Sequence, residues 1–149
     1  IQKGVSRDGI IEAGRRVRAA GIELSEYVLI GVAGPERSLE HARASAEVLN
    51  AIDPEFIRLR TLVPIPGTPL FEQVRRGQFR PLSPHAALRE VQALVRDLEG
   101  PGEVLSDHVS NYWDVRGRLP HGKRTMLQQL EQALSVDESV YLSRRIFSL

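Results

Sequence analysis

Cysteine is absent from all 149 residues of the chain. The chain therefore has no disulfide framework, and it offers no thiolate to bind zinc or an iron–sulfur cluster. Long apolar runs are also missing, so no segment is expected to cross a bilayer, and no signal peptide is recognisable. The formal net charge is only +1, which predicts no general attraction to nucleic acid or to anionic membranes.

The composition that remains is typical of a globular protein, with 42% hydrophobic and 26% charged residues. A chain of this length can bury a core of its own. It begins at Ile1 without a methionine, so we expect it to be a piece of a longer protein or a trimmed product.

The most informative stretch of the sequence runs from residue 56 to residue 70. Its first half alternates as a strand does, and Arg58 and Arg60 fall on the same face. Burying a guanidinium group without an anionic partner is costly. We therefore expect this face either to be open to solvent or to lie beneath something negatively charged. An edge strand whose arginines are solvated is the alternative.

The second half of this stretch is predicted to be an extended loop, because proline at positions 64, 66 and 69 removes backbone donors. Thr68 followed by Pro69 then opens a short helix.

Helices and strands alternate before this loop. Helical patterns that follow the N-cap residues Ser6 and Ser38 alternate with strands at residues 23–30 and 56–62. Residues 27–30 form a continuous apolar run, which is typical of a strand covered on both faces. This order predicts right-handed βαβ units in a parallel sheet or barrel.

The remainder is predicted to be mostly helical. Ser83 caps a long helix, and a weak third strand at residues 103–108 is followed by a loop at residues 111–119. The last two helices are expected at residues 123–134 and from a capping-box pattern at residues 135–138 toward Phe147.

Candidate ligand-binding segments follow the strands, since ligands of parallel α/β folds bind at the carboxyl ends of strands. The glycine-rich turn at residues 31–38 could let a ligand approach its backbone, or it could serve connectivity alone. His108 is a candidate for ligand contact, although a lone histidine is often structural. The other three histidines are interpreted as solvated, and no pair has metal-ligand spacing: His41, His85 and His121.

A resemblance to radical SAM enzymes rests on several motifs in order. Residues 64–70, Pro-Ile-Pro-Gly-Thr-Pro-Leu, resemble the proline-glycine-threonine-proline element of the branch that holds methylthiotransferases, Elongator-type proteins and oxygen-independent coproporphyrinogen oxidases. Residues 29–42 are similar to the glycine-and-glutamate turn after the fifth barrel strand of that branch, and residues 50–62 to its sixth strand. Residues 106–112, Ser-Asp-His-Val-Ser-Asn-Tyr, look like one subgroup.

The resemblance implies an α/β fold, a fragment of a partial (β/α)6 TIM-type barrel with additional C-terminal helices. Residues 1–80 would be the C-terminal half of the barrel and residues 81–149 a mostly helical extension. In the whole enzyme, a 4Fe-4S cluster and S-adenosylmethionine (SAM) generate a deoxyadenosyl radical. Implied cofactor-binding residues are Gly31, Val32, Ala33, Gly34, Glu36, Arg58, Arg60, Leu62 and Val63; substrate-side residues are His108, Asn111 and Tyr112.

The missing cysteines set the limits of this interpretation. The chain is expected to hold no catalytic residue or metal ligand, to bind neither cofactor alone and to be inactive alone. Its first expected partner is the other half of its barrel; without it, we expect a homodimer or a domain swap that buries residues 27–30 and 57–62. A cytoplasmic location is expected. The alternatives are a non-catalytic binding module, a degenerate barrel without a cluster, and an unrelated α/β interaction domain.

Overall fold

The computed structural model of the chain describes residues 4–145, without the side chains of residues 143–145. In chain order the elements are α1 (Arg7–Ala19), β1 (Ser25–Ile30), the short 3-10 helix η1 (Pro35–Arg37), α2 (Ser38–Ile52), β2 (Phe56–Thr61), α3 (Pro69–Arg75), α4 (Pro84–Asp97), β3 (Glu103–Leu105), β4 (Arg116–Arg118), α5 (Lys123–Ser135) and α6 (Glu138–Arg145). Phe147, the expected end of the last helix, lies outside the described residues. Within residues 4–145, no helix is both long and apolar enough to cross a membrane.

The strands form a single mixed sheet in the order β1-β2-β3-β4. β1, β2 and β3 are parallel, and β4 pairs antiparallel with β3. The predicted α/β class is confirmed, and the architecture is consistent with a fragment of a partial α/β barrel. The prediction of a loop at residues 111–119 was wrong in its second half, because β4 has the sequence Arg-Gly-Arg and carries no apolar alternation that would reveal a strand.

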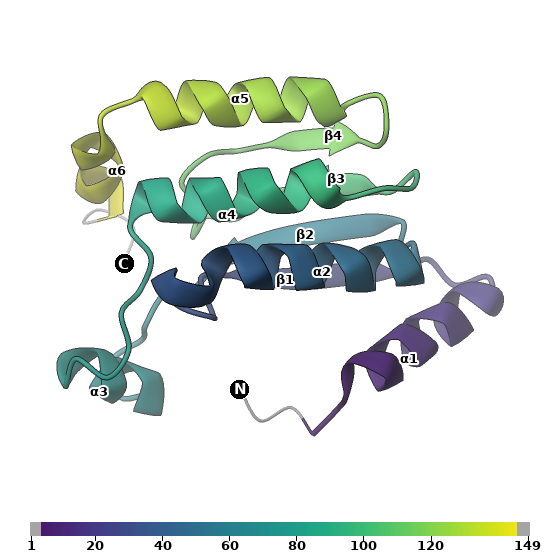
Figure 1. The fold of residues 1–149 in the computed structure, drawn as a ribbon, viewed down its shortest axis with the longest axis horizontal. Helices are drawn as coiled ribbons and strands as arrows, with labels where there is room; N and C mark the ends of the chain where they lie inside the picture. Colours follow the sequence, from purple (N-terminus) through teal and green to yellow (C-terminus); the bar gives the residue numbers. More distant parts are fainter. Residues whose placement is uncertain (1–3, 146–149) are drawn as a thin grey trace.

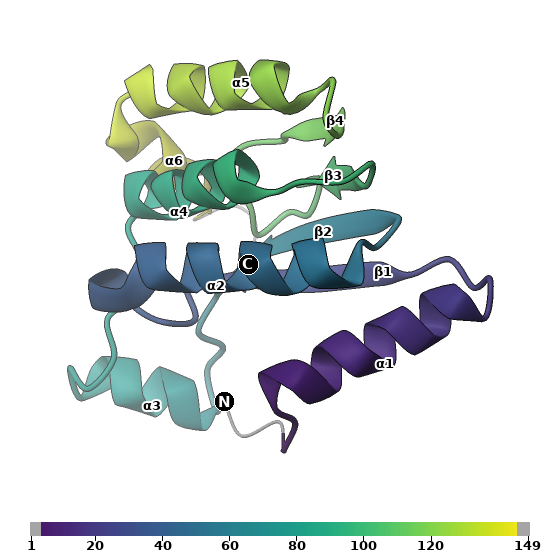
Figure 2. The same cartoon turned by 45° about the vertical axis from the view of Figure 1, so that its right-hand side comes forward.

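Within residues 4–145, helices cover only one face of the sheet. α2, α4 and α5 lie side by side over that face in both views of the ribbon (Figures 1 and 2). The strand residues beneath them are buried, with exposed fractions of 8% or less: Val28, Ile30, Ile57, Leu59, Thr61 and Val104. On the opposite face Tyr27 is 56% exposed. The expectation that residues 27–30 are covered on both faces is therefore wrong within the described part of the chain.

Both sides of position 80 contribute to one hydrophobic core. Leu49 and Leu59 precede that position, whereas Leu94 and Leu130 follow it, and all four belong to the same buried cluster. The division into a barrel part and a helical extension at residue 80 stays a prediction.

Three of the predicted helix caps are confirmed. The hydroxyl oxygens of Ser6, Thr68 and Ser83 each accept a hydrogen bond from a backbone N–H three residues on, at 3.1–3.3 Å. Ser38 was predicted to be a cap as well, which is wrong. It is the first residue of α2, and its hydroxyl donates instead to the buried carboxylate of Glu90.

The predicted capping box at residues 135–138 is also wrong. Ser135 ends α5, and its hydroxyl donates to the carbonyl of Gln132. The Glu138 carboxylate instead accepts the backbone N–H of His85 at 2.7 Å, and this bond lowers the pKa of Glu138. His85 Nε2 lies 2.9 Å from the Val136 carbonyl, so its predicted role as a solvated side chain is corrected: it helps to join α4 to the segment before α6.

The contact between α1 and α2 depends on Gly14. A Cβ atom added there would lie 2.6 Å from Cγ2 of Ile52, closer than side chains can approach. We predict that Gly14→Val lowers the free energy of unfolding by about 1–3 kcal/mol, because overpacking displaces the helix. Urea unfolding would measure it. Ala13→Val, at an exposed position of the same helix, should cost less than about 1 kcal/mol; equal losses would show that the contact does not constrain α1.

Candidate functional site

The carboxyl ends of β1 and β2 lie next to each other in register. Ile30 pairs with Thr61, and the backbone N–H of Leu62 donates to the Ile30 carbonyl at 2.9 Å. The loop after β1 and the proline loop after β2 therefore start side by side, at the end of the sheet where parallel α/β folds bind ligands.

The turn from Gly31 to Gly34 uses two residues with left-handed backbone. Gly31 has φ of +87° and Gly34 has φ of +72°, conformations that side chains with a Cβ rarely adopt. The Gly34 N–H donates to the Gly31 carbonyl at 3.2 Å and closes the turn. Val32 and Ala33, between them, are half-buried.

Glu36 follows this turn but points to another segment. Its carboxylate lies 2.8 Å from the guanidinium of Arg80, and both side chains are 72% exposed. This pair joins the β1–α2 connection to the segment before α4. Because both groups are well solvated, the pair contributes little stability.

The two arginines of β2 lie on the uncovered face of the sheet. β2 is flanked by β1 and β3, so the alternative of a solvated edge strand is wrong. Arg60 Cζ lies 5.0 Å from the centre of the Tyr27 ring, within cation–π distance. Neither Arg58 nor Arg60 forms an ion pair with a residue that the structure describes. Leu62 and Val63, just past the strand, are half-buried.

The segment that follows β3 supports the edge of β2 where β3 has already ended. β3 pairs with only the first three residues of β2. Beyond them, Asn111 Nδ2 donates to the Leu59 carbonyl at 2.8 Å, and its Oδ1 accepts the Thr61 hydroxyl at 3.0 Å. Ser110 Oγ accepts the Thr61 N–H at 3.1 Å. Side chains thus replace strand pairing at the carboxyl end of β2.

The structure separates the three substrate-side candidates. Asn111 is committed to β2, as just described. His108 Nδ1 lies 2.8 Å from Ser110 Oγ in the same loop, and the ring is half-buried. Tyr112 packs against the core, with its ring edge-on to Tyr141 at a centroid distance of 6.0 Å. Contact of these residues with a substrate stays a prediction.

We predict that Asn111→Ala lowers the free energy of unfolding by about 1–3 kcal/mol, because it removes two hydrogen bonds and leaves polar groups of β2 without partners. Chemical denaturation would measure the loss. Val109→Ala is the control in the same loop: Val109 is 72% exposed, so its truncation should change stability by less than about 0.5 kcal/mol. A loss for Asn111→Ala no larger than the control's would contradict the supporting role.

A buried carboxylate behind the glycine turn was missed from the sequence. Glu90, on α4, is fully buried, and its oxygens lie 3.0 Å from the Gly31 nitrogen, 2.5 Å from Ser38 Oγ and 2.9 Å from His41 Nδ1. His41, interpreted above as solvated, is thus mostly buried against Glu90, with 22% of its side chain exposed. Residues 87, 90, 91 and 94 have the spacing of one core-facing side of a helix. A glutamate at position 90, among apolar residues of that side, is the sequence signal that could have revealed a buried carboxylate.

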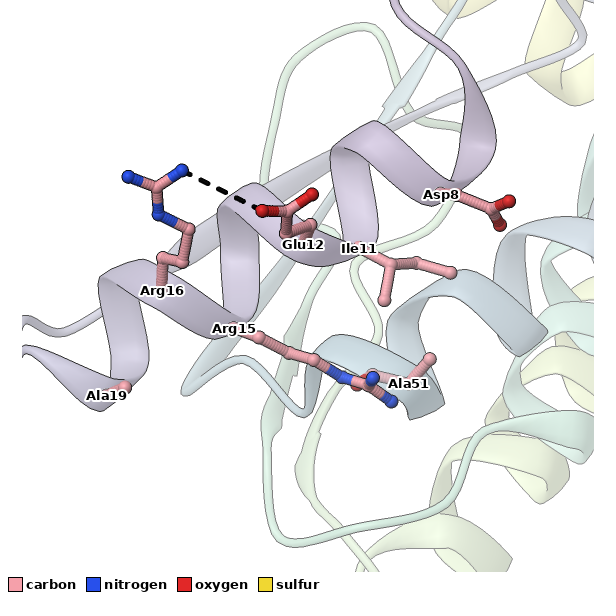
Figure 3. A pocket seen from close by; sticks show the side chains of 7 residues that line it. All are labelled: Asp8, Ile11, Glu12, Arg15, Arg16, Ala19 and Ala51. Atoms are coloured by element: carbon pink, nitrogen blue, oxygen red, sulfur yellow. Dashed lines mark hydrogen bonds and ion pairs between the residues drawn. The ribbon is translucent and has the colours of Figure 1, made fainter.

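A shallow groove elsewhere does not belong to this site. It runs along α1 beside the end of α2, and its lining consists of Asp8, Ile11, Glu12, Arg15, Arg16, Ala19 and Ala51 (Figure 3). Glu12 and Arg16 face each other across one turn at 3.8 Å, and Arg15 donates to the Ala51 carbonyl at 2.8 Å. None of its lining residues comes from the ends of the strands.

Comparison with known proteins gives two informative relatives. A biotin synthase from Frankia alni is 37% identical over 139 aligned residues, which cover 79% of this chain and 37% of the relative. A biotin synthase from Parafrankia sp. is 32% identical over 133 residues, which cover 79% of this chain and 36% of the relative. These matches support the radical SAM superfamily. They do not show whether the chain belongs to the branch that its sequence motifs resemble, which holds methylthiotransferases and Elongator-type proteins.

The chain spans little more than a third of the length of these two relatives. No protein-family model matches it. No solved structure matches it.

Proposed function

We propose that the chain is the C-terminal portion of a radical SAM enzyme, and that its glycine turn and open sheet face form part of the SAM site. The observation that carries the proposal is the one-sided sheet. Arg58 and Arg60 lie on its open face without an anionic partner among the described residues, and that face ends at the turn from Gly31 to Gly34. The similarity to biotin synthases supports the same superfamily.

The residues of this chain do not fit the iron–sulfur cluster. The sequence contains no cysteine, and no group of three or more His, Cys, Asp or Glu side chains in residues 4–145 is arranged to hold a metal ion. Cluster binding is therefore assigned to the other part of the enzyme, and no chemical step is assigned to this chain. Alone, the chain is expected to be inactive.

The residues do fit the organic cofactor. Bound next to a cluster, SAM supplies the deoxyadenosyl radical. In the turn from Gly31 to Gly34 both glycines are buried, and the half-buried Val32 and Ala33 between them would lie along the adenosine, with Leu62 and Val63 beside the adenine. Arg58 and Arg60 would neutralise the carboxylate of the methionine group or of an anionic substrate. Glu36, paired with Arg80, would hold the rim of the turn.

On the substrate side, we propose that His108, Asn111 and Tyr112 contribute from the loop that adjoins the end of β2. Asn111 does so by holding β2, since both ends of its amide are already engaged there. The substrate is left open. A cytoplasmic location follows from the oxygen sensitivity expected of such clusters.

A partner is proposed for the open face. We propose that the other half of the same barrel covers it in the whole enzyme, and that the isolated chain covers it by dimerising or by swapping elements. Sedimentation of the isolated chain would test this: a dimer that buries Tyr27 is expected, whereas a monodisperse monomer at high concentration would contradict self-association.

The test of function uses a protein extended upstream of Ile1 and reconstituted anaerobically with iron and sulfide. Iron content and the release of deoxyadenosine from SAM under reduction would be measured. A cluster together with deoxyadenosine would support the proposal. A second candidate, a degenerate module without a cluster, is favoured by the absence of cysteine; a longer protein that assembles no cluster would select it.

A further inference from the structure

Glu90 bridges both ends of the connection between β1 and α2. Gly31, the first residue after β1, donates its backbone N–H to one carboxylate oxygen at 3.0 Å. Ser38, the first residue of α2, donates its hydroxyl to the other oxygen at 2.5 Å. The carboxylate comes from α4, which follows the proline loop. Glu90 lies 59 positions after Gly31 and 52 positions after Ser38 in the sequence.

Burial makes this bridge more than a surface contact. The Glu90 side chain is fully buried, and a buried carboxylate is costly unless donors surround it. His41 supplies the third contact, with Nδ1 at 2.9 Å, and His41 Nε2 lies 3.4 Å from Ser45 Oγ. With the carboxylate as the acceptor, His41 Nδ1 is the donor in this pair.

The Ser38 hydroxyl bonds to the Glu90 carboxylate instead of capping α2. A serine at the start of a helix ordinarily accepts a backbone N–H of its first turn, but here the helix has no side-chain cap and Ser38 is directed to Glu90. Gly31, with φ of +87°, points its N–H to the same group. Both ends of the turn are thus held by the carboxyl group of one residue.

We propose that Glu90 is a positioning residue, which fixes the turn from Gly31 to Ser38 in the conformation that receives SAM. The inference rests on the function proposed above and adds to it a residue from α4 that does not touch the cofactor. It predicts that loss of the hydrogen bonds made by the side chain at position 90 weakens cofactor binding, whereas turnover at saturating cofactor is largely retained.

The experiment compares Glu90→Leu, Glu90→Gln and the control Glu131→Gln in the extended, reconstituted protein. Glu131 is exposed on α5. Glu90→Leu should raise the Kd and KM for SAM by about tenfold or more, change kcat for deoxyadenosine release by less than about threefold, and speed amide exchange at Gly31. Glu90→Gln should stay within about threefold of the wild type, because its amide can accept from Gly31 and donate to Ser38. The control should match the wild type.

A folded Glu90→Leu protein with unchanged Kd for SAM and unchanged exchange at Gly31 would overturn the inference. If Glu90→Leu does not fold, Ser38→Ala removes a single donor, and a Kd for SAM raised about threefold or more supports the role whereas an unchanged Kd rejects it. A wild-type protein that binds no SAM would defeat the proposed function itself, and the positioning role with it. The two failures can be distinguished, because SAM binding by the wild-type protein is measured before any variant is compared with it.

Discussion

Replacing Leu59 by alanine should lower the free energy of unfolding by about 2–5 kcal/mol. Leu59 is 1% exposed on the helix-covered face of β2, among other buried core residues. The methyl and methylene groups removed would leave a cavity that rigid helices cannot close. Urea unfolding at a concentration where the chain is monomeric would measure the loss.

Leu29 is the matched control, because it lies one register position away on β1 and faces the opposite side of the sheet. Leu29→Ala should cost less than about 1 kcal/mol in the isolated chain. In a protein extended upstream of Ile1 the cost should rise if the proposed other half of the barrel buries this side chain. Similar losses for both substitutions in the monomeric isolated chain would contradict a one-sided sheet.

The second large effect concerns the open face. Replacing both Arg58 and Arg60 by alanine in the extended enzyme should raise the Kd for SAM by about 10–100-fold, because charge-assisted bonds to a carboxylate are lost. Equilibrium dialysis would measure it. The fold should persist, since neither guanidinium is ion-paired to a residue within the described range.

Arg124→Ala is the control for this pair, since Arg124 is exposed on α5 and its loss changes the net charge by one. It should leave the Kd for SAM unchanged. If the double variant binds SAM as tightly as the wild type but loses turnover, the arginines meet an anionic substrate instead. If neither property changes, the open face is not part of the site.

Local sequence signals predicted most of the elements because they act over short distances. Ser6, Thr68 and Ser83 cap their helices through side-chain contacts three residues away, and the apolar stripe of α4 buries Leu88 and Val91 as its spacing predicts. The residues that follow β1 and β2 were placed correctly at one end of the sheet, because parallel strands bring their carboxyl ends together.

Long-range pairings were not predictable from one sequence. Ser38 has the residue type and position of a cap, yet a carboxylate 52 positions away takes its hydroxyl. His41 looked solvated for the same reason: its partner lies on another helix. Residues 27–30 looked covered on both faces because they form a continuous apolar run, yet the ring of Tyr27 is exposed in this structure and lies within cation–π distance of Arg60.

The ends of β1 and β2 are proposed to form part of a SAM site, and amide hydrogen exchange of the extended, reconstituted protein with and without SAM tests this most directly. We expect slower exchange at Gly31–Gly34 and at Leu62 and Val63 when SAM is bound, with little change along α5. Protection confined to other segments, with exchange at these residues unchanged in a protein that demonstrably binds SAM, would contradict it.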